Sequence, residues 1–241
     1  MIVYPAIDLI GGSCVRLYRG DFDQQTTYHA SPVEVAQTYR AEGAEWLHLV
    51  DLDGAKNPEN RQIPLIKNII QASDLKVQTG GGVRSVEDVE KLLHVGASRA
   101  VIGSLAVKDQ DTTQTIFKKF GAECICLATD VLPQNGEYMI AVSGWQEGSA
   151  VTINDLIEGY LDVGLKHILC TDISRDGTLG GPNIDLYKTV KNDFADIQIQ
   201  ASGGVSSLDD LKVLNTDGII IGKALYEDLF TVEQALEAAA C

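Results

Sequence analysis

The two halves of this 241-residue sequence carry the same landmarks in the same order. Gly81-Gly82-Val83 recurs 122 positions later as Gly203-Gly204-Val205, and Ile102-Gly103 recurs after 119 positions as Ile221-Gly222. Two aspartates repeat as well: Asp8 with Asp130, and Asp51 with Asp172, at offsets of 122 and 121. Landmarks that stay in register over half a chain indicate a fold built from two equivalent halves.

Short apolar and β-branched runs alternate with segments of helical spacing along the whole chain. The predicted strands lie at 2–4, 46–50, 75–77, 100–102, 125–127, 167–169, 197–199 and 218–221. Helices are predicted at 31–43, 61–73, 85–96, 152–164 and 206–215, several of them opened by a capping Ser, Thr or Asn and closed by Gly. One strand about every 30 residues favours parallel βαβ units over hairpins.

Eight such units predict an α/β protein that is a single (β/α)8 TIM barrel, with half-barrels of about 1–121 and 122–241. The alternative, an open doubly wound sheet, predicts no internal symmetry. Because the two halves already complete one barrel, we expect a monomer.

Charge and composition narrow the function classes. The chain has 34 acidic and 19 basic side chains, a net charge of −15, which argues against a nucleic-acid-binding surface. No apolar run approaches the roughly 20 residues that span a bilayer, and the N-terminus lacks the basic start of a signal peptide, so we expect a cytoplasmic protein. Five cysteines without a Cys-x-x-Cys spacing favour neither a disulfide framework nor a zinc site.

Glycines follow the predicted strands at positions suited to binding phosphate. Glycine lets backbone N–H groups approach an oxyanion, and the N-terminus of the following helix adds partial positive charge. The repeat predicts two phosphate cradles on opposite sides of the barrel mouth, and the alternative is that these glycines only make tight turns. The first cradle comprises Gly81, Gly82, Gly103 and Ser104, and the second comprises Gly203, Gly204, Gly222 and Lys223.

Asp8 and Asp130 occupy equivalent strand ends, between the two predicted cradles. Two carboxylates so placed suit general base and general acid roles on one ligand, although each could instead cap a helix or pair with a cation. We expect His48 to be packed in the barrel, and we predict no metal site, since Asp51-x-Asp53 lacks matching His or Glu. Further binding candidates are Arg16, Trp145, Thr171, Asp172, Arg175 and Gly177, the last two in a glycine-rich segment, 174–183, that we interpret as a lid.

Several of these residues belong to longer motifs. The motifs are Pro5-Ala6-Ile7-Asp8-Leu9, Val15-Arg16-Leu17, Gly20-Asp21, Thr79-Gly80-Gly81-Gly82, Gly144-Trp145 and the run from Thr171 to Thr178. Together these motifs resemble an isomerase family of histidine biosynthesis, which acts on phosphoribosylformimino-aminoimidazole carboxamide ribotide. The resemblance covers essentially the whole chain.

This resemblance implies an Amadori rearrangement, in which an aminoaldose with a phosphate at each end becomes an aminoketose without a cofactor or metal. Carried over by position, Asp8 takes the C2′ proton and Asp130 is the acid that assists ring opening to a Schiff base. One departure is the stretch Ala128-Thr129-Asp130, where a Leu-Asp or Val-Asp pair is expected.

Three alternatives stay open. The related cyclase of the same pathway shares the repeat and the glycines but carries Cys-Leu-Asp where this chain has Ala6-Ile7-Asp8. A bifunctional isomerase that also serves tryptophan synthesis has extra arginine in the fifth loop, where this chain has Ser143, so we expect a single substrate. A non-catalytic phosphosugar-binding barrel would keep the cradles but would not need both aspartates.

Overall fold

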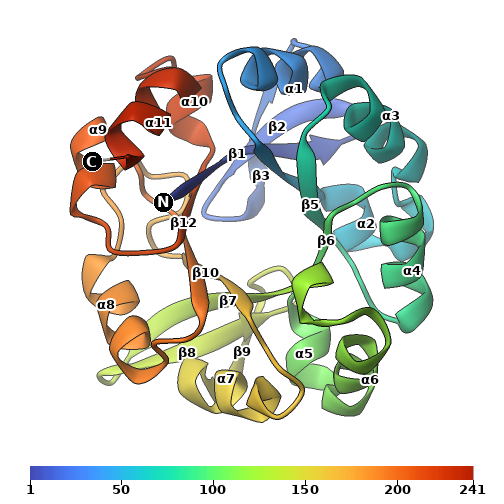
Figure 1. The fold of residues 1–241 in the computed structure, drawn as a ribbon, viewed down its shortest axis with the longest axis vertical. Coiled ribbons are helices and arrows are strands. Elements are labelled where there is room, and N and C mark those ends of the chain that lie inside the picture. Colours follow the sequence, from blue (N-terminus) through green and yellow to red (C-terminus); the bar gives the residue numbers. More distant parts are fainter. Residues whose placement is uncertain (241) are drawn as a thin grey trace.

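A computed structural model, which describes residues 1–240, shows eight parallel strands closed into one barrel (Figure 1). Every neighbouring pair is parallel, and the β7–β10 pairing joins the ends of the sheet and closes the barrel. In order around the barrel the strands are β1 (Ile2–Ile10), β4 (Trp46–Asp51), β5 (Lys76–Gly80), β6 (Arg99–Ile102), β7 (Ile125–Gln134), β10 (His167–Asp172), β11 (Gln198–Ser202) and β12 (Gly218–Ile221). The predicted barrel and its eight strands are confirmed.

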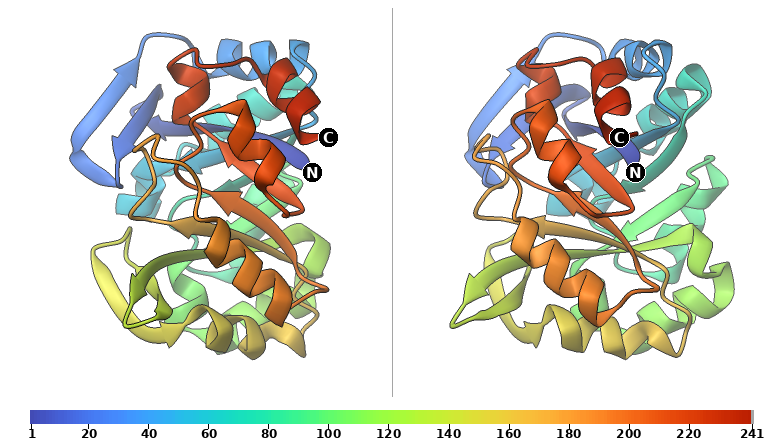
Figure 2. Two further views of the ribbon diagram at one scale, coloured as in Figure 1. Left: turned by 90° about the vertical axis from the view of Figure 1, so that its left-hand side faces the viewer. Right: turned by 60° about the vertical axis from the view of Figure 1, so that its left-hand side comes forward.

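Four further strands form two antiparallel extensions that the sequence pattern did not predict. They are β2 (Ser13–Tyr18) with β3 (Asp21–Tyr28), and β8 (Glu137–Val142) with β9 (Glu147–Thr152). β3 is exposed or half-buried along its whole length, so its sequence lacks the apolar alternation by which a strand is recognised. Figure 2 shows both extensions at the same end of the barrel, where they rise over the C-terminal ends of the strands.

Helices cover the outside of the barrel. The five predicted segments contain α1 (Pro32–Ala41), α3 (Ile63–Ser73), α4 (Val86–His94), α7 (Ile153–Leu161) and α9 (Leu208–Val213). The remaining helices are α2 (Leu52–Lys56), α5 (Ser104–Lys108), α6 (Gln110–Phe120), α8 (Ile184–Asp193), α10 (Lys223–Tyr226) and α11 (Val232–Ala239), with short 3-10 turns at Pro58–Asn60 and Ala122–Cys124. No helix among residues 1–240 is both long enough and apolar enough to cross a membrane.

The halves correspond in their hydrogen bonds as well as in their sequence. Ser85 caps α4 by accepting from Asp88 N–H, and Ser207 caps α9 by accepting from Asp210 N–H. The carboxylates of these aspartates in turn accept from Arg84 N–H and Ser206 N–H, two positions that are also 122 residues apart.

The barrel interior contains a polar layer. Gln78 Nε2 donates to Gln200 Oε1 at 2.6 Å and lies 3.1 Å from His48 Nδ1. Arg99 Nη1 donates to Gln78 Oε1 at 3.3 Å, and its guanidinium stacks on the Trp46 ring. His48 is 7% exposed, as expected for a packed histidine.

Candidate active site

A cavity of about 870 Å³ opens at the C-terminal ends of the strands, a volume in the range of small-molecule sites. A second, much smaller hollow of about 30 Å³ adjoins it, and Arg16, Ser202 and Ile220 line both. Predicted residues that line the large cavity are Asp8, Arg16, Gly81, Gly82, Gly103, Ser104, Asp130, Trp145 and Thr171. Those that line the small hollow are Arg16, Gly177, Gly203, Gly204, Gly222 and Lys223.

Asp8 is held by an ion pair inside the mouth. It lies on β1 opposite Val15 of β2, and this register brings Arg16 Nη1 to within 2.7 Å of Asp8 Oδ2. The two side chains are 18% and 14% exposed, so little water separates them. Burial raises the pKa of Asp8, and the Arg16 guanidinium opposes that rise. The ion pair favours the ionised form of Asp8.

Asp130 lies on β7, on the far side of the barrel from β1 (Figure 1). Its register partner on β10 is Thr171. Burial raises the pKa of Asp130, and only the hydrogen bonds from Trp145 and Thr171 oppose the rise. Both of those donors are neutral, whereas Asp8 is paired with a guanidinium. The two carboxyl groups therefore lie in environments of different charge.

A third carboxyl group, Asp176, lines both hollows and was not identified from the sequence. Burial raises its pKa to about 6; Arg16 opposes the rise, and the nearby Asp8 and Asp130 add to it. The repeat could not reveal this residue, because the equivalent first-half positions hold Gly54 and Ala55. The remaining signal is its place in the glycine-rich segment after β10.

The paired glycines of the two cradles are required by close backbone contacts. Gly82 and Gly204 have φ values of +71° and +88°. A Cβ would lie 1.8 Å from Gly54 O in the first case and 2.3 Å from Gly181 O in the second. At Gly222 an added Cβ would lie 1.2 Å from Arg16 Nη2. Arg16 therefore lies between Asp8 and the second cradle.

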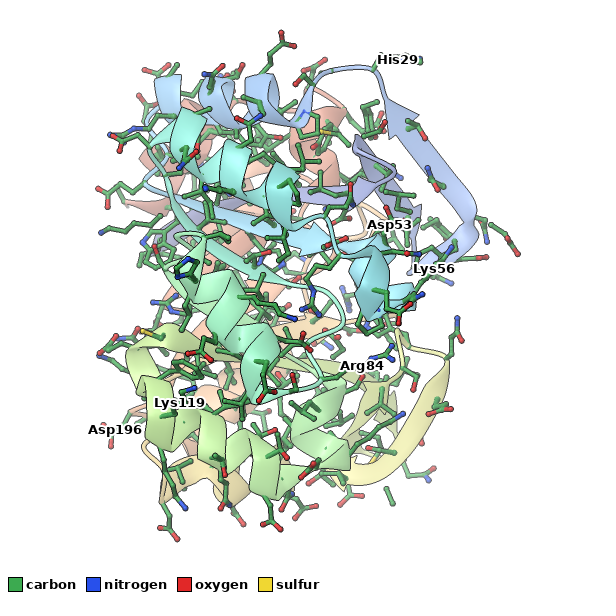
Figure 3. All side chains as sticks on the ribbon, turned by 90° about the vertical axis from the view of Figure 1, so that its right-hand side faces the viewer. His29, Asp53, Lys56, Arg84, Lys119 and Asp196 are labelled. Atoms are coloured by element: carbon green, nitrogen blue, oxygen red, sulfur yellow. The ribbon has the colours of Figure 1, made fainter. Side chains whose placement is uncertain are left out.

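The first cradle is more open and is flanked by two cations, Lys56 and Arg84, that line the large cavity. Lys56 Nζ lies 4.0 Å from the ring centre of Phe22, and Arg84 Nη2 donates to Ala55 O at 3.4 Å. Figure 3 shows Asp53, Lys56 and Arg84 toward the mouth and Lys119 and Asp196 at the opposite end of the barrel. These positive groups offset locally the negative charge of the chain.

Trp145 reaches over the mouth from a strained turn between β8 and β9. Ser143, Gly144 and Trp145 have φ values of +57°, +64° and +69°. The turn is fixed to α5: Ser143 N–H donates to Ser104 Oγ at 2.9 Å, and Lys108 Nζ donates to Ser143 Oγ at 2.7 Å. The indole packs so closely on Gly20, between β2 and β3, that a Cβ there would lie 2.3 Å from the ring. The two extensions therefore meet across the mouth.

Two predicted binding residues, Asp172 and Arg175, do not line either hollow. The Asp172 carboxylate accepts from Ser174 N–H, Ser174 Oγ–H and Asn183 Nδ2–H. Arg175 Nη1 donates to the carbonyl groups of Gly181 and Pro182. Their contacts hold the glycine-rich segment in shape, and Lys223 Nζ anchors it from the other side through Gly177 O at 2.9 Å.

No group of three or more His, Cys, Asp or Glu side chains within residues 1–240 is arranged to hold a metal ion. The polar groups that face the cavity are carboxyl groups, cationic side chains and the backbone of the glycine-rich loops. This set suits proton transfer on an anionic ligand.

Residues 2–231 match the family described as histidine biosynthesis protein. The chain belongs to this family. A similar protein of Francisella philomiragia is 52% identical over 240 residues, covering 98% of this chain and 100% of the relative. Proteins of Mannheimia succiniciproducens and Idiomarina loihiensis are 51% and 50% identical, with 98% of this chain covered in each case and 96% and 98% of the relatives.

All three relatives carry one name, 1-(5-phosphoribosyl)-5-((5-phosphoribosylamino)methylideneamino) imidazole-4-carboxamide isomerase. The family and its full-length match agree with the resemblance seen in the sequence motifs. The shared name describes a substrate with two phosphoribosyl groups, and the site has two glycine-rich cradles.

Proposed function

We propose that this protein converts the bisphosphorylated aminoaldose named for its relatives into the corresponding aminoketose, with Asp8 as base and Asp130 as acid. The reaction is an isomerisation of the aldose–ketose type in histidine biosynthesis, as in the family. The observation that carries the assignment of roles is the difference between the two carboxyl groups: Asp8 is ion-paired with Arg16, and Asp130 is bonded by neutral donors.

In the first step, Asp130 donates a proton to the ribose ring oxygen. The C1′–O bond then breaks, and the nitrogen lone pair forms the C1′=N bond of a protonated Schiff base. A carboxyl group can donate in this way only while it is protonated, and burial favours that state at Asp130.

In the second step, Asp8 removes the proton from C2′. The electrons of the C–H bond form a C1′=C2′ double bond, and the iminium nitrogen recovers its lone pair, giving an enolamine. Return of a proton to C1′ and loss of the C2′ hydroxyl proton give the ketone. C2′ is oxidised and C1′ reduced within one molecule, so no external oxidant is needed. Arg16 keeps Asp8 ionised for this transfer.

The two cradles support binding of the two phosphate groups, one on each side of the reacting ribose. Backbone N–H groups at Gly81-Gly82 and Gly203-Gly204, together with Lys223, bind anions without requiring a positive net charge on the protein. Because one chain supplies both carboxyl groups and both cradles, we propose that the monomer is active.

Asp176 is the second candidate for the acid. It lines both hollows, and its pKa of about 6 leaves it partly protonated near neutral pH. We assign the acid role to Asp130 because it lies opposite Asp8. Comparison of Asp130→Asn with Asp176→Asn distinguishes the two candidate acids.

The test is to follow conversion of the aldose ribotide to the ketose by the wild type and by Asp8→Asn and Asp130→Asn. We expect the wild type to convert the substrate and each variant to lose at least about a hundred-fold in kcat, because acid–base groups contribute roughly 10²–10⁴-fold. A wild type that binds the ribotide without converting it would identify a binding protein instead. If Asp130→Asn keeps near wild-type kcat, Asp130 is not the acid.

A further inference from the structure

A buried arginine, Arg61, lies directly behind the first phosphate cradle. Its side chain is 5% exposed and contacts three oxygen atoms at once. Nη1 forms an ion pair of 2.9 Å with Asp88 Oδ1, while Nη2 donates to Gly82 O at 2.5 Å and to Gly81 O at 3.3 Å. Arg61 does not line either hollow, so its effect on a ligand must pass through the loop.

These contacts fix the direction of two peptide planes. In a trans peptide the C=O and the following N–H point in opposite directions. With the Gly81 and Gly82 carbonyls turned toward Arg61, the N–H groups of Gly82 and Val83 point away from it, and Gly81, Gly82 and Val83 all line the large cavity. The guanidinium thereby orients the donors of the cradle.

The second cradle reaches the same arrangement by a different means. Gly204, which corresponds to Gly82, has its carbonyl held by Gly181 N–H at 2.8 Å. Gln62 and Asn183 precede α3 and α8 and donate to the equivalent aspartates, Asp51 and Asp172, so the position that corresponds to Arg61 holds Pro182, which has no side-chain donor. The backbone therefore holds the second cradle, whereas a single side chain holds the first.

The ion partner of Arg61 is itself fixed to the same loop. Burial would raise the pKa of Asp88, but the Arg84 N–H and the Arg61 guanidinium together lower it. The carboxylate lies in the first turn of α4 and accepts from Arg84 N–H at 3.0 Å. Arg61 is thus tied to the helix that follows the cradle as well as to the cradle.

We propose that Arg61 is a positioning residue that holds the first cradle in its phosphate-binding form. The proposal rests on the proposed function, because it assumes that this cradle binds one phosphate of the substrate. Its planar fork contacts two carbonyls and one carboxylate together, which a lysine ammonium cannot reproduce in the same geometry.

The test compares Arg61→Met and Arg61→Lys with the wild type. We expect Arg61→Met to raise KM for the ribotide about ten-fold with kcat within about three-fold, since charged hydrogen bonds of this kind are worth about one decade or more in affinity. Arg61→Lys should recover part of the loss. If Arg61 only stabilised the fold, Arg61→Met would lower thermal stability without raising KM selectively over kcat. An unchanged KM in both variants overturns the proposal.

Arg40→Met is the matched control. Arg40 also donates to a backbone carbonyl, Ala44 O, and pairs with an aspartate, Asp74, but it lies on α1 away from the cavity. We expect its KM to equal that of the wild type. If Arg61→Met does not fold, Asp88→Asn, which removes the charge of the ion partner, takes its place. We expect this variant to raise KM for the ribotide about three-fold, and an unchanged KM overturns the proposal.

Calorimetric titration with inorganic phosphate separates this proposal from the function itself. We expect the wild type to bind two phosphate ions and Arg61→Met to retain only the site at the second cradle. This result does not depend on turnover, so it supports the role of Arg61 even if the ribotide is not the substrate. Equal binding of two ions by both proteins overturns the role of Arg61 while leaving the isomerase activity unaffected.

Discussion

Arg16 donates to the Asp8 carboxylate at 2.7 Å, and its guanidinium lies against the backbone of Gly222 in the second cradle. One side chain therefore contacts both the candidate base and a candidate phosphate site. Burial alone would lower the pKa of Arg16, but Asp8 and Asp176 raise it, so the guanidinium remains charged. Binding of a phosphate at the second cradle would be felt at Asp8 through this contact.

The Gly222→Ala variant tests this link. The added Cβ would displace the end of Arg16. We expect a higher KM and a rising limb of the pH–kcat profile moved to higher pH, because Asp8 loses its cation and its pKa rises. Gly148→Ala, where nothing lies within 4 Å, is the control. An unchanged profile would show that Arg16 does not set the ionisation of Asp8.

Asp176→Asn should stabilise the protein at high pH. The pKa of Asp176 is about 6 in the folded chain and about 3.9 in an unfolded one, so the folded state binds more protons between these values and loses stability as pH rises through them. A pKa shift of this size corresponds to roughly 3 kcal/mol in a fully buried group, and partial exposure to solvent reduces it. We therefore expect the variant to gain about 2 kcal/mol in free energy of unfolding at pH 8 and little at pH 4. Urea unfolding of both proteins at pH 8 and pH 4 measures the gain in stability. An equal gain at the two pH values contradicts the prediction.

The same variant separates the two candidate acids. With Asp130 as the acid, Asp176→Asn should keep kcat within about ten-fold of the wild type, while Asp130→Asn loses at least about a hundred-fold. Steady-state kinetics at pH 7 measures both. The reverse order of losses would assign proton donation to Asp176.

His48 makes the fold sensitive to acid. Burial lowers its pKa to about 3 from an ordinary value of 6.5, so the unfolded state binds more protons between these values and stability falls as pH drops through them. We expect His48→Gln, which can still hydrogen-bond Gln78, to lose several kcal/mol less than the wild type between pH 7 and pH 4. Denaturant titrations at the two pH values provide the comparison, and parallel losses would contradict the role of His48.

Chelation should leave turnover unchanged, because the proposed steps use only carboxyl groups, an arginine and backbone donors. The measurement is kcat before and after dialysis against EDTA. A loss that added Mg²⁺ or Zn²⁺ restores would require a metal-dependent step.

The parts of the site that repeat were predictable, and so were Arg16 and Trp145, which do not repeat, whereas Asp176 and Arg61 were missed. Asp8 and Asp130 stand at matching strand ends, so sliding the sequence on itself finds them together. Asp176 has glycine or alanine at the equivalent positions, and its role depends on how an irregular segment folds toward Arg16. Arg61 is a single arginine before a helix, and nothing local reveals that it turns toward the glycine carbonyls.

The fold shows the same division. Strands buried on both faces, such as β10, are continuous apolar runs and were recognised, whereas β3 is polar because water covers it. Asp172 was expected in the binding site from its strand-end position, its repeat partner Asp51 and the motif from Thr171 to Thr178. Its carboxylate is instead occupied by Ser174 and Asn183, a choice decided by the loop that follows.

The hydrogen bond between Gln78 and Gln200 constrains how this sequence can evolve. Each amide is buried, and replacing Gln78 by an apolar residue would leave Gln200 Oε1 without its donor at a cost of about 1–3 kcal/mol, and would also remove a contact of His48 and one of Arg99. A change at Gln78 therefore disturbs three neighbouring side chains at once. At the barrel axis, substitutions are therefore constrained by side chains from four strands that belong to both halves of the chain.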